Sequence, residues 1–173
     1  PDTYFFPRGF SDVDLLKRAY WAQKTLLEKH WASRAPELPL RDPYQALILA
    51  SIIEKETGRA GERPEIAGVF VNRLRKGWRL QTDPTVIYGL GDAFDGNLRR
   101  VDLESDTPYN TYTRFGLPPT PIALPGRAAI AAALQPAKTE AMFFVARGDG
   151  SHVFSRTLEE HNRAVRRFQL GLQ

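Results

Sequence analysis

The chain has 173 residues, of which 42% are hydrophobic and 25% charged, so it is long enough to bury a core and has the composition of an ordinary globular protein. Its net charge of +4 is modest, and no recognised nucleic-acid-binding module accompanies the arginines grouped at 73–79, 99–100 and 163–167, so we expect these to cover solvated helix faces and to bind no nucleic acid. Cysteine is absent, which excludes disulfides, thiolate metal sites and a cysteine nucleophile, and no run of about 18 apolar residues is present to span a membrane.

The N-terminal part predicts one helix followed by a connection. The first residues, Pro-Asp-Thr-Tyr-Phe-Phe-Pro, open abruptly and look like part of an ordered structure, so we expect a piece of a longer protein, in which absent targeting signals mean little. Ser11 followed by Asp12 and Asp14 is typical of a capped helix N-terminus, and apolar residues recur at helical spacing as far as Trp31. Residues 34–43 contain three prolines and are expected to form a connection.

The second predicted helix is mostly apolar and ends in two carboxylates. Asp42 can cap it, Pro43 fits its first position, and Gly58 is suited to ending it. Between residues 47 and 53 only Ser51 is polar. This stretch therefore predicts a helix that packs into a core and carries Glu54 to Thr57 at its end.

Glu56 continues the apolar face of this helix. At about 100° per residue, Leu49, Ile52, Ile53 and Glu56 fall on one side, whereas Glu54 points away from it. A carboxyl group carried toward a core either has a partner or holds its proton more tightly than in water, and a raised pKa suits a general acid near neutral pH. Two interpretations stay open, a general acid and a helix-end residue paired with an arginine.

The next helix is predicted to begin at Pro64 and to end at Gly77, with a buried stripe formed by Ile66, Val69, Phe70 and Leu74. This arrangement of helix, turn and helix places Glu56 at a helix end beside a turn. Such a position is accessible to a substrate.

From Trp78 to Pro125 the chain is rich in glycine and proline, so we expect a long irregular region. It is also aromatic, with Tyr88, Phe94, Tyr109, Tyr112 and Phe115. A long aromatic segment inside a domain is often a binding region, and tyrosines suit sugar faces. The alternative, that these rings only pack the segment down, is equally open.

The C-terminal part predicts a small antiparallel sheet between two helices. Gly126–Leu134 is an alanine-rich helix, Met142–Ala146 and His152–Phe154 are strands joined by a glycine turn, and Thr157 to Glu160 is a capping box that opens a final helix. We therefore expect one α+β domain over residues 1–173, mainly helical, with a small hairpin and a long aromatic loop region.

The residue types favour carboxylate chemistry. The three histidines, His30, His152 and His161, are far apart and lack metal-ligand spacing, and no phosphate-binding glycine loop or serine elbow is present, so we expect no metal and no cofactor. His152 in a hairpin is more typical of a packed or hydrogen-bonded histidine than of a ligand. Glu56 is the first candidate catalyst and Asp83 the second, although Asp83 before Pro84 also fits a turn cap.

Five motifs occur in register along the chain. They are Ile53-Glu54-Lys55-Glu56-Thr57, Val71-Asn72-Arg73-Leu74, Leu80-Gln81-Thr82-Asp83-Pro84-Thr85-Val86-Ile87-Tyr88-Gly89, Tyr109-Asn110-Thr111-Tyr112 and Gly116-Leu117-Pro118-Pro119. With the opening Pro-Asp-Thr-Tyr and the closing hairpin followed by His161-Asn162, they closely resemble the endolytic murein transglycosylase family called MltG or YceG-like. The resemblance covers essentially the whole chain.

The resemblance implies a lyase that cuts the β-1,4 bond between N-acetylmuramic acid and N-acetylglucosamine within peptidoglycan glycan strands and leaves 1,6-anhydro-N-acetylmuramic acid ends. It further implies a longer protein with one N-terminal membrane helix and a LysM-like module, on the periplasmic or extracytoplasmic face of the cytoplasmic membrane. Residues 1–173 would be its catalytic domain alone, a monomer that binds glycan strands and contacts proteins of cell-wall synthesis.

The family's catalytic glutamate directly precedes a threonine, which corresponds to Glu56 and agrees with the helical periodicity. Because positive charge develops at the anomeric carbon, we expect mainly neutral polar groups around it. The candidate substrate-binding residues are Thr57, Asn72, Gln81, Asp83, Tyr88, Tyr109, Asn110 and Tyr112.

In the implied mechanism one carboxyl group suffices. Protonated Glu56 would donate to the glycosidic oxygen and, as carboxylate, would then take the proton of the sugar's own C6 hydroxyl, which attacks C1 in place of water.

Three alternative functions remain. One is a hydrolase in which Asp83 or Glu54 activates water and leaves reducing ends, and another is a non-catalytic glycan- or partner-binding domain. The third is nucleic-acid binding through the arginines, with steep salt dependence.

Overall fold

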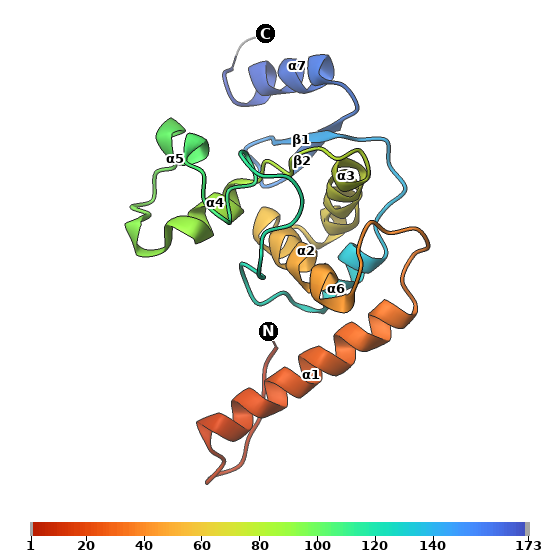
Figure 1. Cartoon of the computed structure of the whole chain (residues 1–173), viewed down its shortest axis with the longest axis vertical. Helices are drawn as coiled ribbons and strands as arrows, with labels where there is room; N and C mark the ends of the chain where they lie inside the picture. Colours follow the sequence, from red (N-terminus) through yellow and green to blue (C-terminus); the bar gives the residue numbers. More distant parts are fainter. Residues whose placement is uncertain (1, 172–173) are drawn as a thin grey trace.

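Three helices form the centre of the molecule, and a two-stranded sheet with a final helix lies against them (Figure 1). The computed structural model describes residues 2–171. In chain order its elements are α1 (Asp12–Ala32), α2 (Pro43–Glu56), the 3-10 turn η1 (Ala60–Glu62), α3 (Arg63–Arg75), α4 (Asp83–Leu90), the 3-10 turn η2 (Gly91–Ala93), α5 (Arg100–Glu104), α6 (Arg127–Leu134), β1 (Phe143–Ala146), β2 (His152–Ser155) and α7 (Leu158–Phe168). The mainly helical α+β class is as predicted.

Helix α2 is the most deeply placed element. It begins where the Asp42 carboxylate accepts the backbone N–H of Gln45 at 2.8 Å, and its residues 48–53 are all buried against α3 and α6. Full burial of a side chain such as Ile52 or Ile53 contributes about 1.5–3 kcal/mol, so this packing fixes the helix firmly. The helix ends at Glu56 with an extended Thr57 as its cap rather than with a left-handed glycine at position 58.

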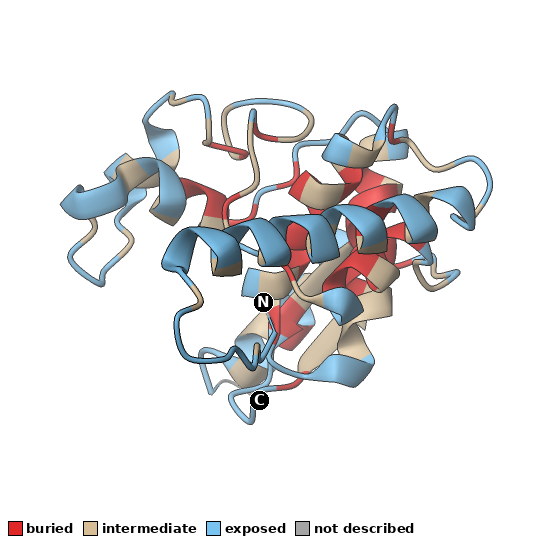
Figure 2. Cartoon of the chain, turned by 90° about the horizontal axis from the view of Figure 1, so that it is seen from below, coloured by how far each residue is buried: buried red, intermediate tan, exposed pale blue. Residues whose placement is uncertain are grey.

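Helix α1 covers one edge of this core. Figure 2 shows that its outward surface is exposed while buried residues gather in the helices behind it, and only Leu27 of α1 is buried. Among residues 2–171, no helix is both long enough and apolar enough to cross a bilayer.

Helix α3 brings the hairpin onto the core through a close backbone approach. A Cβ on Gly68 would lie 2.7 Å from the carbonyl oxygen of Ala137 and equally near the Thr139 methyl, so only glycine lets the segment before β1 lie directly on α3. Gly77, with φ +65°, follows the end of α3 in the left-handed region, as predicted.

The strands pair antiparallel, with Phe143 opposite Ser155 and Ala146 opposite His152. The Phe144 ring meets the edge of Phe70 of α3 at 5.8 Å, which fixes the sheet to the core. Helix α7 lies across this sheet and starts at the predicted capping box of Thr157 (Figure 1).

The region from Trp78 to Pro125 is less irregular than predicted, because it contains α4 and α5. The prolines of this region are expected to keep it irregular, yet Pro84 lies in the first turn of α4, where its missing N–H would have no partner in any case. Helix α4 points its first turn at the end of α2. This places Thr82 and Asp83 next to Glu56.

Candidate active site

Glu56 opens onto a cleft of about 450 Å³. One group of lining residues comes from the end of α2, residues 81–83 and Tyr112, and another comes from β1, His152 and one side of α7. The predicted residues Glu56, Gln81, Asp83 and Tyr112 therefore come together in one cleft.

The Glu56 side chain is half-buried and has one hydrogen-bond donor, the Thr82 hydroxyl, which donates to Oε1. Burial raises the pKa of Glu56; the Thr82 bond opposes this, the charge of Asp83 adds to it, and Arg73, together with His152 when its ring is protonated, opposes it. Ion pairs within residues 2–171 do not include Glu56. The interpretation of Glu56 as a residue paired with an arginine is therefore wrong. The net effect of its surroundings is a raised pKa, which favours the protonated acid.

Thr82 is held by a buried group of hydroxyls. Its N–H donates to Thr111 Oγ1 at 3.1 Å, its carbonyl accepts from Thr85 Oγ1 at 2.8 Å, and the two other hydroxyls lie 2.9 Å apart. All three threonines are buried. Thr82 is not among the predicted site residues, although it lies between Gln81 and Asp83, because only the approach of α4 to α2 gives it a role.

Gln81 has a left-handed backbone, with φ +49°, and its N–H donates to Thr111 O at 3.1 Å. This conformation costs a non-glycine residue about 1 kcal/mol and is common beside functional sites. The exposed side chain lines the cleft.

Glu54 has different neighbours from Glu56, as the helical periodicity predicts. Its Oε2 accepts the backbone N–H of Gly126 at 2.9 Å at the start of α6, and its Oε1 lies 3.8 Å from Arg63 Nη2. It does not line the cleft.

Asp83 lines the cleft together with Tyr112, whose hydroxyl donates to Asp83 Oδ1 at 2.5 Å. Burial raises the pKa of Tyr112, and the bond to Asp83 and its charge add to this, so the phenol stays a donor. Asp83 does not cap α4, because Thr82 occupies the N-cap position. Its place in the first turn still suits a negative charge.

Arg73 corrects the expectation that the arginines cover solvated helix faces. Its side chain is only 7% exposed, lines the cleft, and donates from Nε to Met142 O at 2.8 Å and from Nη1 to Leu80 O. Arg75, by contrast, is exposed, as are the other arginines of the three groups. Arg73 ties α3 to the residue directly before β1 and to the segment that leads to Thr82.

Two histidines also line the cleft. His152 is hydrogen-bonded to Glu62, as its place in a hairpin predicts, with 2.7 Å between Nδ1 and Oε2. His161 of α7 stacks on Phe143 at 5.2 Å, and burial, with the charge of Arg73, lowers its pKa. Within residues 2–171, no group of three or more acidic or histidine side chains is arranged to hold a metal ion.

Asn110, predicted to bind substrate, does not line the cleft. It is fully buried, its Nδ2 donates to the carbonyls of Asp102, Leu103 and Ser105, and its Oδ1 accepts the Tyr112 N–H at 2.8 Å. In this arrangement it holds the loop that presents Tyr112.

Asn72 and Thr57 also lie outside the cleft lining. The Asn72 amide donates to Thr139 O at 2.8 Å and Ala141 O at 3.0 Å, and the Thr57 hydroxyl accepts the Arg59 N–H at 3.0 Å. Both side chains therefore bond to nearby backbone.

Tyr88 and Tyr109 pack on each other, with ring centres 4.9 Å apart, and the Tyr109 hydroxyl bonds to Thr120 at 2.8 Å. Tyr88 is exposed, but neither ring lines the cleft. Of the loop aromatics, only Tyr112 lies beside Glu56.

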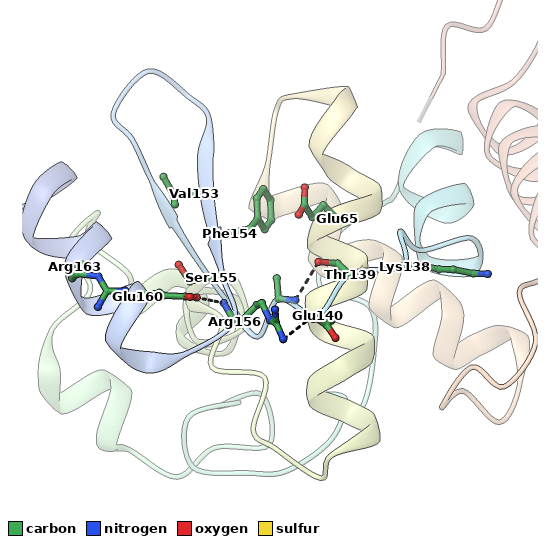
Figure 3. Close-up of a pocket in the computed structure, with 11 residues that line it drawn as sticks. Glu65, Lys138, Thr139, Glu140, Val153, Phe154, Ser155, Arg156, Glu160 and Arg163 are labelled. Carbon is green, nitrogen blue, oxygen red and sulfur yellow. Dashed lines mark hydrogen bonds and ion pairs between the residues drawn. The ribbon is translucent and has the colours of Figure 1, made fainter.

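A second hollow, of about 700 Å³, lies between the start of α3, the segment before β1, β2 and α7 (Figure 3). Arg156 pairs with Glu140 at 2.8 Å, and Glu160 accepts the Arg156 backbone N–H at 2.8 Å. The backbone N–H groups of Arg156 and Thr157 lower the pKa of Glu160, whereas burial raises that of Glu56, so the Glu56 cleft is the better candidate for acid catalysis.

Comparison with known proteins identifies the family. The model of the YceG-like family matches residues 1–167. The chain belongs to the YceG-like family. It is 47% identical over 125 residues to the endolytic murein transglycosylase of Bacillus subtilis (strain 168), covering 72% of this chain and 34% of that protein. It is 33% identical over 127 residues to the endolytic murein transglycosylase of Streptococcus pneumoniae (strain ATCC BAA-255 / R6), covering 70% of this chain and 23% of that protein.

A crystal structure of a YceG-like protein from Listeria monocytogenes is also similar, with a TM-score of 0.65 and 41% identity, over 87% of this chain and 44% of that one. The YceG-like chain described here thus spans about a third of the length of its Bacillus relative. The family inferred from the five sequence motifs is confirmed.

Proposed function

We propose that this YceG-like chain is the catalytic part of an endolytic lytic transglycosylase, which cleaves the bond between N-acetylmuramic acid and N-acetylglucosamine in peptidoglycan and leaves 1,6-anhydro ends. The observation that carries this proposal is a single carboxyl group, Glu56, whose burial raises its pKa and which opens onto a cleft. The names of the Bacillus and Streptococcus relatives support the choice of substrate.

In the proposed reaction Glu56 serves twice. Its proton passes to the glycosidic oxygen as the bond from that oxygen to C1 breaks, and the N-acetylglucosamine portion leaves with a new hydroxyl. The resulting carboxylate takes the proton of the C6 hydroxyl while that oxygen bonds to C1 of the same sugar. Atoms balance without water, and Glu56 ends protonated and ready for the next turnover.

The neighbours of Glu56 suit this sequence of steps. The Thr82 hydroxyl can donate to the carboxylate form, and the buried threonines fix its direction, so the same oxygen is presented for both proton transfers. The negative charge of Asp83, in the same cleft, would stabilise the positive charge that develops at C1.

Hydrolysis is the second candidate, because Asp83 lies in the Glu56 cleft and Tyr112 engages only one of its oxygens in the described bond. A second carboxylate is what a hydrolase needs to activate water. In that reaction the product ends would be reducing.

Mass spectrometry of uncrosslinked glycan strands incubated in ¹⁸O-water separates the two reactions. The proposal expects fragments with anhydro ends, lighter by one water and free of ¹⁸O, from the wild-type chain and none from folded Glu56→Gln. Reducing ends that carry ¹⁸O would refute the transglycosylase and support hydrolysis with Asp83. The control is Glu54→Gln, two residues earlier on α2 and outside the cleft, which should cleave like the wild type.

The proposed substrate also sets the cellular location. Peptidoglycan lies outside the cytoplasmic membrane, so we propose that the chain works on the extracytoplasmic face, as a monomer within a longer protein anchored by a membrane helix and carrying a LysM-like module. Proteins of cell-wall synthesis are its proposed neighbours there.

A further inference from the structure

Glu62 and His152 form a pair at the edge of the Glu56 cleft. Glu62 closes the turn that follows α2, and His152 begins β2. The carboxylate binds His152 twice, with Oε2 2.7 Å from ring Nδ1 and Oε1 accepting the backbone N–H at 3.1 Å. The two side chains are only 11% and 19% exposed, so the pair is well shielded from solvent.

This geometry fixes which ring nitrogen of His152 carries a proton. Burial acts to raise the pKa of Glu62, but the two hydrogen bonds from His152 outweigh it and lower that pKa, so Glu62 is an ionised acceptor. An ionised carboxylate at Nδ1 requires a proton on Nδ1, so in the uncharged ring Nε2 is the nitrogen able to accept. The ring is held in place beside Phe144, at 5.5 Å, and Phe154, at 6.4 Å.

Nε2 of His152 would add an imidazole acceptor to the carboxylates of Glu56 and Asp83 that line the cleft. The hydroxyl groups of Thr82 and Tyr112 already donate to the carboxylates of Glu56 and Asp83. Hydroxyl and acetamido N–H groups of an amino sugar are donors that must find acceptors once water is displaced. His152 lines the cleft with Glu56, and its second nitrogen can meet one of them.

We propose that His152 is a further substrate-binding residue, whose Nε2 accepts a hydrogen bond from a hydroxyl or acetamido N–H of the sugar held beside Glu56. Glu62 is its positioning residue, because it fixes the tautomer and the ring direction. The inference rests on the proposed function, since it takes an amino-sugar strand as the ligand.

Two substitutions at His152 separate binding from structure. In His152→Asn the side-chain amide can still donate to Glu62, but nothing reaches the place of Nε2. In His152→Gln the longer amide can bring its oxygen to that place. We expect kcat/KM for strand cleavage to fall about tenfold to a hundredfold in the Asn variant, with nearly unchanged melting temperature, and to recover in part in the Gln variant.

The matched control is His30→Asn on α1, which does not line the cleft and should keep wild-type kcat/KM. A folded His152→Asn variant that retains wild-type kcat/KM would overturn the proposal. So would an Asn variant that is better than the Gln variant.

Imidazole ¹⁵N NMR tests the inference without catalysis. The wild type should show His152 protonated at Nδ1 and bare at Nε2, and Glu62→Gln should weaken that preference. Adding an uncrosslinked glycan fragment to the Glu56→Gln variant should shift the His152 Nε2 resonance, and glycan binding that leaves this resonance unmoved would overturn the inference. A wild-type chain that binds strands with this shift but never cleaves them would refute the proposed reaction and leave His152 as a ligand of the glycan.

Discussion

Replacing Glu56 with glutamine should stop strand cleavage and at the same time stabilise the fold. The substitution keeps the shape of the side chain and an oxygen that can still accept the Thr82 hydroxyl, while the new NH₂ can favourably face Asp83, whose charge acts on Glu56 in the wild type. What it removes is the free-energy cost of a buried negative charge. Proteins commonly become more stable when a functional residue that carries such a free-energy cost is replaced.

The direction of the effect follows from the raised pKa of Glu56, and its size from the usual gain when a functional site is relieved of a buried charge. We expect Glu56→Gln to gain about 1–2 kcal/mol of unfolding free energy at pH 8. For a chain of this length that corresponds to a melting temperature higher by about 2–8 °C.

The gain must depend on pH in one direction. Well below 4.5, the ordinary pKa of the group, folded and unfolded wild-type chains both hold the proton, so the variant has little advantage. As pH rises, the unfolded chain loses the proton first, and wild-type stability falls until pH passes the raised folded pKa of Glu56. The difference between the two proteins should therefore grow across this window and then level off.

Thermal and urea unfolding followed by circular dichroism from pH 4 to pH 8 measures this difference. The control is Glu54→Gln, which loses the ion pair with Arg63 and should be neutral or destabilised by up to about 1 kcal/mol. A Glu56→Gln variant that is no more stable than the wild type at pH 8, or equally stabilised at pH 4 and pH 8, would refute the reasoning.

Three further changes test the surroundings of Glu56. Thr82→Val removes the hydroxyl that favours the carboxylate, so the alkaline limb of the kcat–pH profile should move to higher pH and kcat should fall about tenfold; an unmoved limb would contradict this. Asp83→Asn should still give anhydro ends in the mass-spectrometric assay, with a rate lowered about three- to tenfold as the Tyr112 hydroxyl loses a charged partner, whereas complete loss of cleavage would favour hydrolysis. Asn110→Ala should lower the free energy of unfolding in urea by about 2–4 kcal/mol, because buried carbonyls lose their donor, and a loss below about 1 kcal/mol would argue against its structural role.

Local signals were sufficient for most elements. Asp42 and Pro43 start α2, and the Thr157 capping box starts α7, because the caps satisfy backbone groups within one turn and need no distant partner. Helix α4 was missed because Pro84 breaks a helix interior but starts a helix when it lies in the first turn.

The site was predictable where one helix decides it. The periodicity of α2 alone predicts that Glu56 and Glu54 lie on different faces of the helix and have different neighbours. Thr82 and the pair of Glu62 with His152 could not be found in this way, since their partners lie 26 and 90 residues away and meet only after α4 and the hairpin have docked.

The two candidate asparagines show why residue type alone does not predict a contact with substrate. Asn72 and Asn110 were candidates for sugar contacts, and the same amide groups instead bind backbone carbonyls of their own fold. A carbonyl of the chain and a carbonyl of a substrate offer the same acceptor. Residue type therefore cannot tell the two apart, and burial decides.

The carboxylates around the end of α2 differ in their partners, and this difference bears on the reaction. Glu54 has a backbone N–H and a guanidinium, Glu62 has two N–H groups of one histidine, and Asp83 has the Tyr112 phenol. Glu56 has a hydroxyl, and burial raises its pKa, which favours the protonated acid. A hydrolase would need a second carboxylate to hold water, so the Asp83 oxygen that Tyr112 does not engage would have to take that role. One group that gives and then retakes a proton needs no second carboxylate, which is why we expect anhydro rather than reducing ends.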